Sequence, residues 1–353
     1  MEAPVNTALS SEPGMPVEIG RIDKELGKLW EASDDSKTRA SLINLVIYTE
    51  QESALTSNTE VISAIAGKHA CRAILILAKP DAKESKAQAW ISAHCHLQGK
   101  GQRQICSEQI TFRLDGDSAG ALPNIVFSHL DSDLPLCMWW QEEFPEPLDE
   151  KLWSWVDRLI YDSSTWRNPR HQFHLMRHLS TREGNSTVLC DLNWTRLHAW
   201  RFGLAAMFDH AEAYPRLSSV DKLSVVCAPG QRTAALLLIG WFASRLGWTP
   251  IEGEEAFATP SGSNVPVGIE EKEGSHVSLF SVKCAEAHFE LELKTGAAFF
   301  ETTIHAPGIP DSHQLLPAPN PKLEETLLAE LSRSGRHPLY TKALEIVLPL
   351  IGQ

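Results

Sequence analysis

The chain has 353 residues, of which 43% are hydrophobic and 22% are charged, and its formal net charge is −13. Since this length exceeds that of most single domains, we expect two domains with sizeable cores. The acidic balance argues against a sequence-independent nucleic-acid binder, which needs a basic footprint, and against adsorption to anionic membranes.

The sequence carries none of the usual marks of a secreted or membrane protein. Residues 1–20 lack the basic and apolar regions of a signal peptide, and the longest apolar runs, such as 234–243, are too short to span a bilayer. The seven cysteines show no CxxC spacing, and most lie within apolar runs, as small core residues do. We therefore expect a reduced, cytoplasmic protein.

The first half of the chain alternates predicted strands and helices. Residues 1–16 have the composition of a disordered tail, and residues 17–30 have the spacing of an amphipathic helix. Strands are then predicted over 41–48, 71–78, 87–97, 103–114, 134–140 and 158–164, and helices over 58–68, 115–130, 148–156 and 169–180. Most of these strands are apolar throughout, which indicates a mainly parallel sheet with helices on both faces.

The second half combines helix-linked strands with an alternating set. The stretch Thr181–Asn185 (TREGN) is the best candidate for a domain boundary. Beyond it, strands are predicted over 187–192, 223–228, 276–283, 288–295 and 297–305, helices over 189–209, 231–247, 323–331 and 338–348, and a loop over 252–266. The last three strands alternate polar and apolar residues, as an antiparallel meander with one wet face does.

These elements predict an α/β fold in two domains. The N-terminal domain, over 17–180, has a mixed, mainly parallel sheet flanked by helices. The C-terminal domain, over 181–353, is an α/β domain with an antiparallel meander.

Two groups of histidines have spacings that a metal site could use. His94 and His96 share one face of a predicted strand, and His171, His174 and His178 share one face of a predicted helix. The first pair has no third ligand at a diagnostic spacing, and the second group lacks the glutamate of an HExxH motif. The interpretation as ordinary polar positions is stronger, and we predict no metal.

One turn and one strand end are candidates for anion binding. The strand–turn–helix "SVVCAPGQRTAALL" places Arg232 at a helix start, where free N–H groups can hold a phosphate. The stretch "YDSS" places Asp162, Ser163 and Ser164 after a strand, where ligands of α/β proteins often bind. However, GxGxxG, GxxxxGK[ST] and GxSxG are all absent, and no base is positioned beside these serines. We therefore predict no catalytic residues, and capping of the next helix is the stronger interpretation of these serines.

The unusual feature of the sequence is its aromatic content, with 11 tryptophans and only 4 tyrosines. Trp139 and Trp140 end a predicted strand, and Trp194 and Trp200 lie in the predicted helix of "LCDLNWTRLHAWRFGLAAMFD". Tryptophan and arginine often anchor protein interfaces through their large area and forked hydrogen bonding. Packing between the sheet and its helices is an equally good reading of these tryptophans.

Several stretches resemble one family of accessory proteins. "LPLCMWW", "DRLIYDSS", "DLNWTRLHAWR", "APGQRTAALLLIGWFASRLGW" and "GRHPLYTKAL" occur in an order similar to that of the glucose-6-phosphate dehydrogenase assembly protein family, OpcA. "HACRAILI" and "RQICSEQITF" resemble its N-terminal half, so that the similarity runs from roughly Leu42 to the C-terminus. The "DLNWTRL…W" block is the most specific part.

The resemblance implies a bacterial cytoplasmic protein that is not an enzyme and that needs no cofactor. Such proteins bind glucose-6-phosphate dehydrogenase, promote its oligomerisation and raise its activity, and that enzyme feeds NADPH production in the oxidative pentose phosphate pathway. Cyanobacterial members are associated with a thiol switch. The last cysteine here is Cys284, so the final helices carry no thiol that could serve such a switch.

Two hypotheses follow for the site. In the first, a partner surface for glucose-6-phosphate dehydrogenase is supplied by Trp139, Trp140, Asn193, Trp194, Arg196, Trp200 and Arg201. Part of this motif could instead stabilise the fold, with Asp191 as a helix cap or the partner of an arginine. In the second hypothesis, the chain is a sugar-phosphate-binding protein or a cryptic enzyme, with a site near Asp162, Ser163 and Arg232. The oligomeric state of the chain alone stays open.

Overall fold

The computed structural model describes residues 13–31, 37–97, 104–181 and 187–351. Contacts divide the chain into two compact units. Unit 1 comprises Met1–Tyr161, Ser180–Leu189 and Leu323–Arg333, and unit 2 comprises Asp162–Leu179, Cys190–Lys322 and Ser334–Gln353. The predicted boundary lies largely in 182–186, outside the described residues. The segment before it, 162–179, belongs to unit 2, and 180–189 belongs to unit 1. Among the described residues, every helix is too short or too polar to cross a membrane.

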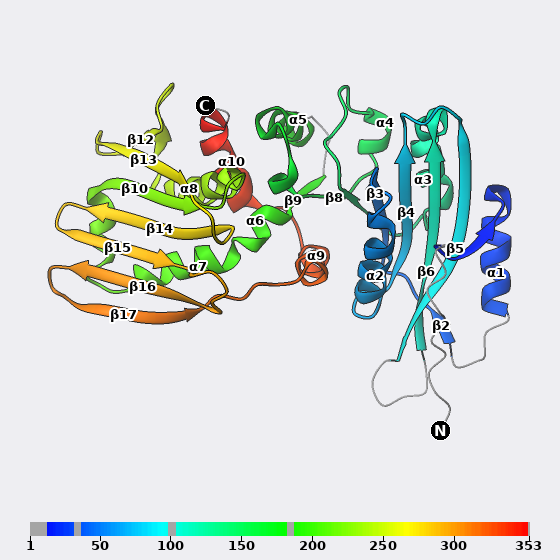
Figure 1. The fold of residues 1–353 in the computed structure, drawn as a ribbon, viewed down its shortest axis with the longest axis horizontal. Helices are drawn as coiled ribbons and strands as arrows, with labels where there is room; N and C mark the ends of the chain where they lie inside the picture. The colour runs from blue at the N-terminus through cyan, green and yellow to red at the C-terminus, as the bar shows by residue number, and fades with distance from the viewer. Residues whose placement is uncertain (1–12, 32–36, 98–103, 182–186, 352–353) are drawn as a thin grey trace. The chain divides into compact units, whose positions relative to one another are not determined.

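Unit 1 is built around a nine-stranded sheet whose strand order is β1-β5-β6-β4-β3-β7-β8-β9, with β2 paired to β6. Its strands are β1 (Met15–Val17), β2 (Lys37–Arg39), β3 (Ile43–Thr49), β4 (Cys71–Lys79), β5 (Lys86–Leu97), β6 (Gln104–Asp115), β7 (Leu136–Trp140), β8 (Arg158–Tyr161) and β9 (Val188–Asp191). Its helices are α1 (Ile22–Glu31), α2 (Ala54–Ala66), α3 (Leu122–His129), α4 (Glu150–Trp153) and α9 (Leu323–Ser332). Figure 1 shows this sheet with α2, α3 and α4 beside it.

The centre of this sheet is parallel, as the apolar strands predicted. Strands β6, β4, β3, β7 and β8 are joined by parallel pairs, and every residue of β3 is buried. The five parallel strands therefore follow the doubly wound order, with the third, second and first on one side and the fourth and fifth on the other. The predicted mixed, mainly parallel sheet is confirmed.

Three local predictions for unit 1 need correction. Met15 and Pro16, expected in a disordered tail, pair with β5 as part of β1, and residues 1–12 lie outside the described part. Helix α2 starts at Ala54 rather than near Asn58. The start was not predicted because the residue before it, Ser53, makes no side-chain capping hydrogen bond. The predicted helix over 148–156 is reduced to the four residues of α4.

The expectation that all cysteines are reduced is wrong for one pair. Cys95 and Cys106 lie directly opposite each other on β5 and β6, and they form a disulfide. The pairing of β5 with β6 brings the two cysteines together, and their separation of 11 residues in the sequence does not predict the disulfide. The other five cysteines are free and buried, as predicted for small core residues.

Unit 2 is built around an eight-stranded sheet of order β11-β12-β13-β10-β14-β15-β16-β17 (Figure 1). Its strands are β10 (Val220–Cys227), β11 (Thr249–Pro250), β12 (Ala256–Ala258), β13 (Asn264–Glu271), β14 (Val277–Cys284), β15 (Ala287–Glu292), β16 (Phe299–Ala306) and β17 (Ile309–Pro317). Its helices are α5 (Pro169–Thr181), α6 (Leu192–Arg196), α7 (His198–Met207), α8 (Arg232–Leu246) and α10 (Pro338–Val347).

The predicted meander is confirmed as β14–β16, and β17 extends it by a further antiparallel pair. The sequence analysis missed β17 and placed a loop over β12 and the start of β13, because prolines and glycines interrupt the alternation there. With both sheets flanked by helices, the two-domain α/β fold class is confirmed.

Helix α8 is the buried core helix of unit 2, and it is apolar on all sides. Gly240 lets it approach α10, because a Cβ at that position would lie 2.5 Å from the carbonyl oxygen of Ala343. The helix ends at Gly247, whose φ of 69° is the left-handed conformation that only glycine adopts freely.

Candidate functional site

The "DLNWTRLHAW" block forms two short helices rather than one. Asp191 caps α6 by accepting the backbone N–H of Asn193 at 3.0 Å, and the Thr195 hydroxyl donates to the Asp191 carbonyl at 3.1 Å. The backbone leaves helical geometry at Leu197, where α6 ends and α7 begins. The predicted continuous helix over 189–209 is therefore interrupted at Leu197.

The "YDSS" turn contacts this cap directly. The backbone N–H and the hydroxyl of Ser163 donate to the two carboxylate oxygens of Asp191, at 3.0 and 2.6 Å. The Asn193 amide in turn donates to the Ser163 hydroxyl at 3.0 Å, and the Tyr340 hydroxyl reaches Asp191 at 3.4 Å. Asp191, Ser163 and Tyr340 are each about 1% exposed. One carboxylate thus joins the turn, α6 and α10 inside unit 2.

The electrostatics of this cluster are set by burial and by one arginine. Burial raises the pKa of Asp191 to about 7, against the hydrogen bonds from Ser163, which lower it. Burial alone would also raise the pKa of Asp162, but the hydrogen bonds and charge of Arg196 outweigh it and leave the pKa lowered. The Arg196 guanidinium holds both carboxylate oxygens of Asp162 at 3.0 and 2.5 Å, in the bidentate geometry typical of strong pairs.

The cluster is a structural one. Ser163 and Asp191 are inaccessible to a substrate, and the acceptor beside the Ser163 hydroxyl is a carboxylate and not a histidine base. The polar side chains of the cluster also form hydrogen bonds with one another, although they lie far apart in the sequence. The prediction that Asp191 caps a helix is confirmed. The arginine of this cluster, Arg196, pairs with Asp162 and not with Asp191 as the alternative prediction had it.

Trp194 and Arg201 form a second contact of the same block. The Arg201 guanidinium lies 3.7 Å from the centre of the Trp194 ring and donates to the Trp194 carbonyl oxygen at 2.7 Å. The Trp194 ring also packs against Tyr340, with 5.5 Å between ring centres. Arg201 therefore fixes the end of α6 against α7.

Trp139 and Trp140 lie in unit 1 and pack its core. Trp140 stacks on Tyr48 with 3.8 Å between ring centres and 5° between the ring planes, and it meets Trp153 edge-on. Trp139 is 4% exposed. These two tryptophans belong to β7 of unit 1 and are not part of the Asp191 cluster.

The residues predicted as a partner surface are therefore mostly interior. Trp139, Trp140, Asn193, Trp194 and Trp200 are buried, while Arg196 and Arg201 are partly exposed. Two of the seven, Arg196 and Trp200, line a pocket of about 710 Å³ in unit 2. The other walls are mainly apolar and come from α7, the β15–β16 turn and the segment after β17: Ala199, Leu293, Phe299, Phe300, Pro317 and Pro319.

His276 belongs to the same pocket and was missed by the sequence analysis. Burial lowers the pKa of His276 to about 4, so its ring is neutral near pH 7. It is the residue before β14, and a single histidine at a strand start gave no signal in the sequence. Arg196 is the charged residue among those that line this pocket, which combines an apolar surface with one guanidinium and one neutral imidazole.

The predicted anion-binding residues are committed to other partners. Ser163 is held by Asp191, and Arg232 pairs with Glu255. At the turn before α8, the Gly230 N–H donates to the Glu271 carboxylate at 3.1 Å. Protein carboxylates thus occupy the positions where an external anion would bind, and the described contacts do not bring Ser163 and Arg232 together.

The crevice between β3 and β7 is where a doubly wound sheet usually binds its ligand. Here the Glu142 carboxylate, just after β7, accepts the Glu50 N–H at 2.9 Å at the start of the turn after β3. Beside it, the amides of Asn58 and Gln141 form two mutual hydrogen bonds, at 2.9 and 2.8 Å. The turn "TEQES" has no glycine, whereas the phosphate-binding turn of a dinucleotide-binding doubly wound sheet is rich in glycine.

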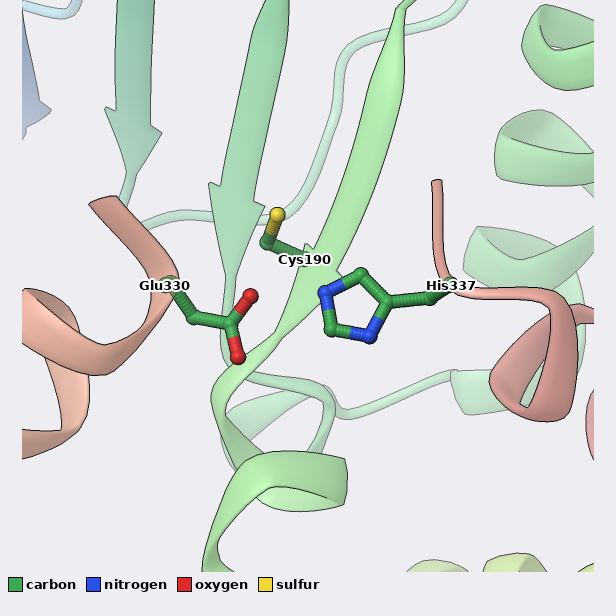
Figure 2. A group of neighbouring side chains, drawn as sticks. All are labelled: Cys190, Glu330 and His337. Atoms are coloured by element: carbon green, nitrogen blue, oxygen red, sulfur yellow. The ribbon is translucent and has the colours of Figure 1, made fainter. Parts of the chain in front are cut away.

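Of the histidines predicted to be ordinary polar positions, His94 has a polar contact of this kind. His94 Nε2 lies 2.7 Å from the Gln109 amide oxygen, and burial lowers the pKa of His94. Figure 2 draws a different pair in unit 2, Cys190 and His337, with a ring nitrogen within 4.8 Å of the sulfur. Glu330, also drawn, belongs to unit 1 and is not assigned to this pair.

Two family models match the chain in sequence. The model described as the N-terminal domain of the glucose-6-phosphate dehydrogenase subunit OpcA matches residues 62–178, and the model of its C-terminal domain matches residues 187–344. Between them they cover most of both units.

Individual relatives bear related names. OxPP cycle protein OpcA of Synechocystis is 29% identical over 68% of this chain, and the match spans about half, 53%, of the relative. The protein of the same name from Synechococcus elongatus is 28% identical over 96% of this chain and 79% of the relative.

Two solved structures show a weak likeness of the fold. An aldose-aldose oxidoreductase from Caulobacter crescentus is 12% identical, with a TM-score of 0.48 over 86% of this chain and 95% of that chain. A levoglucosan dehydrogenase with NADH and L-sorbose is 9% identical, with a TM-score of 0.46 over 88% and 96%. Similarity at this level assigns neither an activity nor a ligand to this chain.

Proposed function

The chain belongs to the OpcA family of glucose-6-phosphate dehydrogenase assembly proteins, and from this premise we propose that it is a non-catalytic accessory protein. In this proposal it binds the glucose-6-phosphate dehydrogenase of its own cell, promotes assembly of that enzyme and activates it allosterically. The setting is the cytoplasm, where the enzyme supplies NADPH through the oxidative pentose phosphate pathway. The observation that carries the proposal is the match of both family models along one chain.

The geometry supports an accessory role over catalysis. At the crevice of the parallel sheet, the Glu142 carboxylate binds the Glu50 N–H beside the Asn58–Gln141 pair, and the buried Asp191–Ser163 pair has no access to a substrate. The alternative, a sugar-phosphate site at Asp162, Ser163 and Arg232, gains no support, because each of these side chains is bonded to another residue of the chain.

For the partner surface we propose the pocket of unit 2, which holds the accessible part of the Trp/Arg block. Arg196 and Trp200 lie on its wall, and Phe299 at its rim is 50% exposed. An exposed aromatic beside an arginine is the combination that anchors many protein interfaces. Trp194, which is buried in unit 2, then holds Arg201 without touching the partner.

The test is a titration of the initial rate of the same organism's dehydrogenase with this protein. We expect a saturable rise in rate for the wild type. Ala199→Glu places a charge in the pocket, and we expect it to weaken activation about tenfold, which corresponds to about 1.4 kcal/mol of coupling. Ala206→Glu is the matched control, because Ala206 lies on the same helix, is also half-buried and does not line the pocket.

The outcomes separate the function from the surface. A flat rate at every ratio of wild type to dehydrogenase contradicts the accessory function. A normal rise with Ala199→Glu, in a variant whose circular dichroism matches the wild type, leaves the function standing and rejects the pocket as the docking surface.

A further inference from the structure

The pocket of unit 2 has a wall whose charge is already balanced. Arg196 is its charged residue, and both terminal nitrogens of the guanidinium are bound to the Asp162 carboxylate. The side chains of this ion pair are 30% and 18% exposed, so each charge faces mainly its partner. Aspartate and glutamate are absent from the described residues that line the pocket. The wall therefore offers no uncommitted cation to an acidic group and no acid to a basic group.

His276, the other ionisable side chain of the wall, adds no charge near neutral pH. Burial and, after it, the positive charge of Arg196 lower the pKa of His276 to about 4. An occupant that carries a full charge would lose its hydration in this pocket without an opposite charge to replace it, and that loss is costly. The electrostatics of the wall thus select against charged occupants.

The rest of the wall is apolar and built from flat or rigid groups. The buried rings of Trp200 and Phe300 meet edge-on, with 4.7 Å between ring centres. The proline-rich segment, residues 317–321, contributes three prolines, and the N–H of Ala318 within it donates to the Ala298 carbonyl at 2.9 Å. Because proline fixes φ, this part of the wall is restrained before any partner binds, which lowers the entropy cost of binding.

The apolar surface continues beyond the pocket along α7. Phe299 at the rim is 50% exposed. Phe202 follows Ala199 of the wall by three residues, so the two side chains are neighbours on the surface of one helix, and Phe202 is 67% exposed. An occupant that covers both the pocket and Phe202 is larger than a single side chain. This surface therefore fits a segment of a protein chain.

We propose that the partner inserts an uncharged aromatic side chain into this pocket, beside the proline-rich segment, and that the partner's chain continues over Phe202. The inference rests on the proposed function, because it takes the glucose-6-phosphate dehydrogenase of the same organism as the source of this segment. An aromatic ring fits better than an aliphatic chain, since it can stack on proline rings and meet the Phe299 ring in offset or edge-on geometry.

The first test uses three indole probes of similar size that differ in charge: neutral 3-methylindole, negative indole-3-acetate and positive tryptamine. Calorimetry at pH 7 measures their binding to the full chain, and the amide NMR shifts of residues 296–300 locate it. We expect 3-methylindole to bind about tenfold more tightly than either ion. Ala199→Glu should abolish this binding, and Ala206→Glu, which lies outside the pocket, should keep it.

Three results of the probe experiment overturn the proposal. Tighter binding of indole-3-acetate than of 3-methylindole would show that Arg196 is available to an anion. Tighter binding of tryptamine would show an acidic site. Unchanged shifts at 296–300 with every probe would show that the pocket accepts no ring.

The second test reads the sign of the charge in the complex with the dehydrogenase. Ala298 lines the pocket and is exposed, so Ala298→Glu and Ala298→Lys place opposite charges at one position outside the core. We expect both variants, with wild-type circular dichroism, to bind the dehydrogenase about tenfold more weakly. A gain in affinity with either sign would reveal a charged group in the partner's segment and overturn the proposal, as would unchanged affinity in both.

The two tests fail separately. If the dehydrogenase binds the wild type but the probes do not, the proposed function stands and this inference falls. If the probes bind as expected but the dehydrogenase does not bind, the proposed function falls, and the partner named here falls with it.

Discussion

Two pairs of strand ends use the same device with different consequences. After β3 and β7, the Glu142 carboxylate of the later strand accepts the backbone N–H of Glu50, which follows the earlier one. After β8 and β9, the Asp191 carboxylate likewise accepts the backbone N–H of Ser163. Glu142 is half-buried and Asp191 is 1% exposed. A carboxylate at a strand end can thus bind the turn at a ligand crevice, as Glu142 does, or cross-link the interior, as Asp191 does, and the burial of the carboxylate decides which. We call Glu142 the plug and Asp191 the interior cross-link.

The largest expected effect comes from removing the interior cross-link. Asp191→Ala leaves the N–H groups of Ser163 and Asn193 and the Ser163 hydroxyl without their acceptor. Each buried donor left unpaired costs about 1–3 kcal/mol, so we expect a loss of about 3–5 kcal/mol in the free energy of unfolding. Urea unfolding with hydrogen exchange resolved by unit measures it, and the loss should appear in α6, α7 and α10. Unchanged exchange in those helices would contradict the cross-link.

A second effect is a pH dependence of opposite sign to that of an ordinary paired carboxylate. The pKa of Asp191 is raised to about 7 in the folded protein, against about 3.9 in an unfolded chain. Between these values the folded state binds more protons, so this group makes stability fall as pH rises from about 4 to 7. His276, with its pKa lowered to about 4, contributes the reverse sign in nearly the same window. The difference between wild type and Asp191→Asn therefore isolates the first group, and a pH-independent difference would contradict its raised pKa.

A smaller effect is expected at the plug. Glu142→Ala removes one half-buried acceptor from the Glu50 N–H and frees the start of the β3–α2 turn. We expect a loss of about 1–2 kcal/mol in unfolding free energy, smaller than that of Asp191→Ala because water can replace the carboxylate. Thermal unfolding of both variants side by side checks the order. A greater loss from Glu142→Ala than from Asp191→Ala would reverse the comparison.

The smallest effect is expected at the exposed pair of Arg232 and Glu255. The Arg232 side chain is 31% exposed and that of Glu255 is 39% exposed, and exposed ion pairs contribute about 0–1 kcal/mol. Arg232→Ala should therefore change neither stability nor the binding of inorganic phosphate measurably. Isothermal titration calorimetry with phosphate is the check, and binding in the wild type that Arg232→Ala abolishes would revive the anion-site hypothesis.

The sequence predicted most elements because their signals are local. Apolar runs located β3, β4, β7 and β8, and alternation located β14–β16. Contacts between side chains on neighbouring strands could not be predicted from the sequence. The Cys95–Cys106 disulfide and the Glu142 plug depend on which strands are neighbours, and neither pair has a characteristic spacing.

The candidate site was predicted only in part for a similar reason. The Trp/Arg block and the "YDSS" turn were both singled out, and Asp191 was recognised as a cap, but their mutual contact needed the fold. Composition could not tell an interface tryptophan from a core one. All five predicted tryptophan and asparagine positions of that surface are 5% exposed or less, which directs the search for a partner surface to the pocket beside Arg196.

The measurement that tests the central claim most directly is sedimentation velocity of the same organism's glucose-6-phosphate dehydrogenase, alone and mixed with this protein, with the protein alone as reference. The account predicts a new, heavier species that contains both chains and grows with their ratio until it saturates. Two sets of boundaries that stay at the positions of the separate proteins at every ratio would contradict an assembly role for this chain.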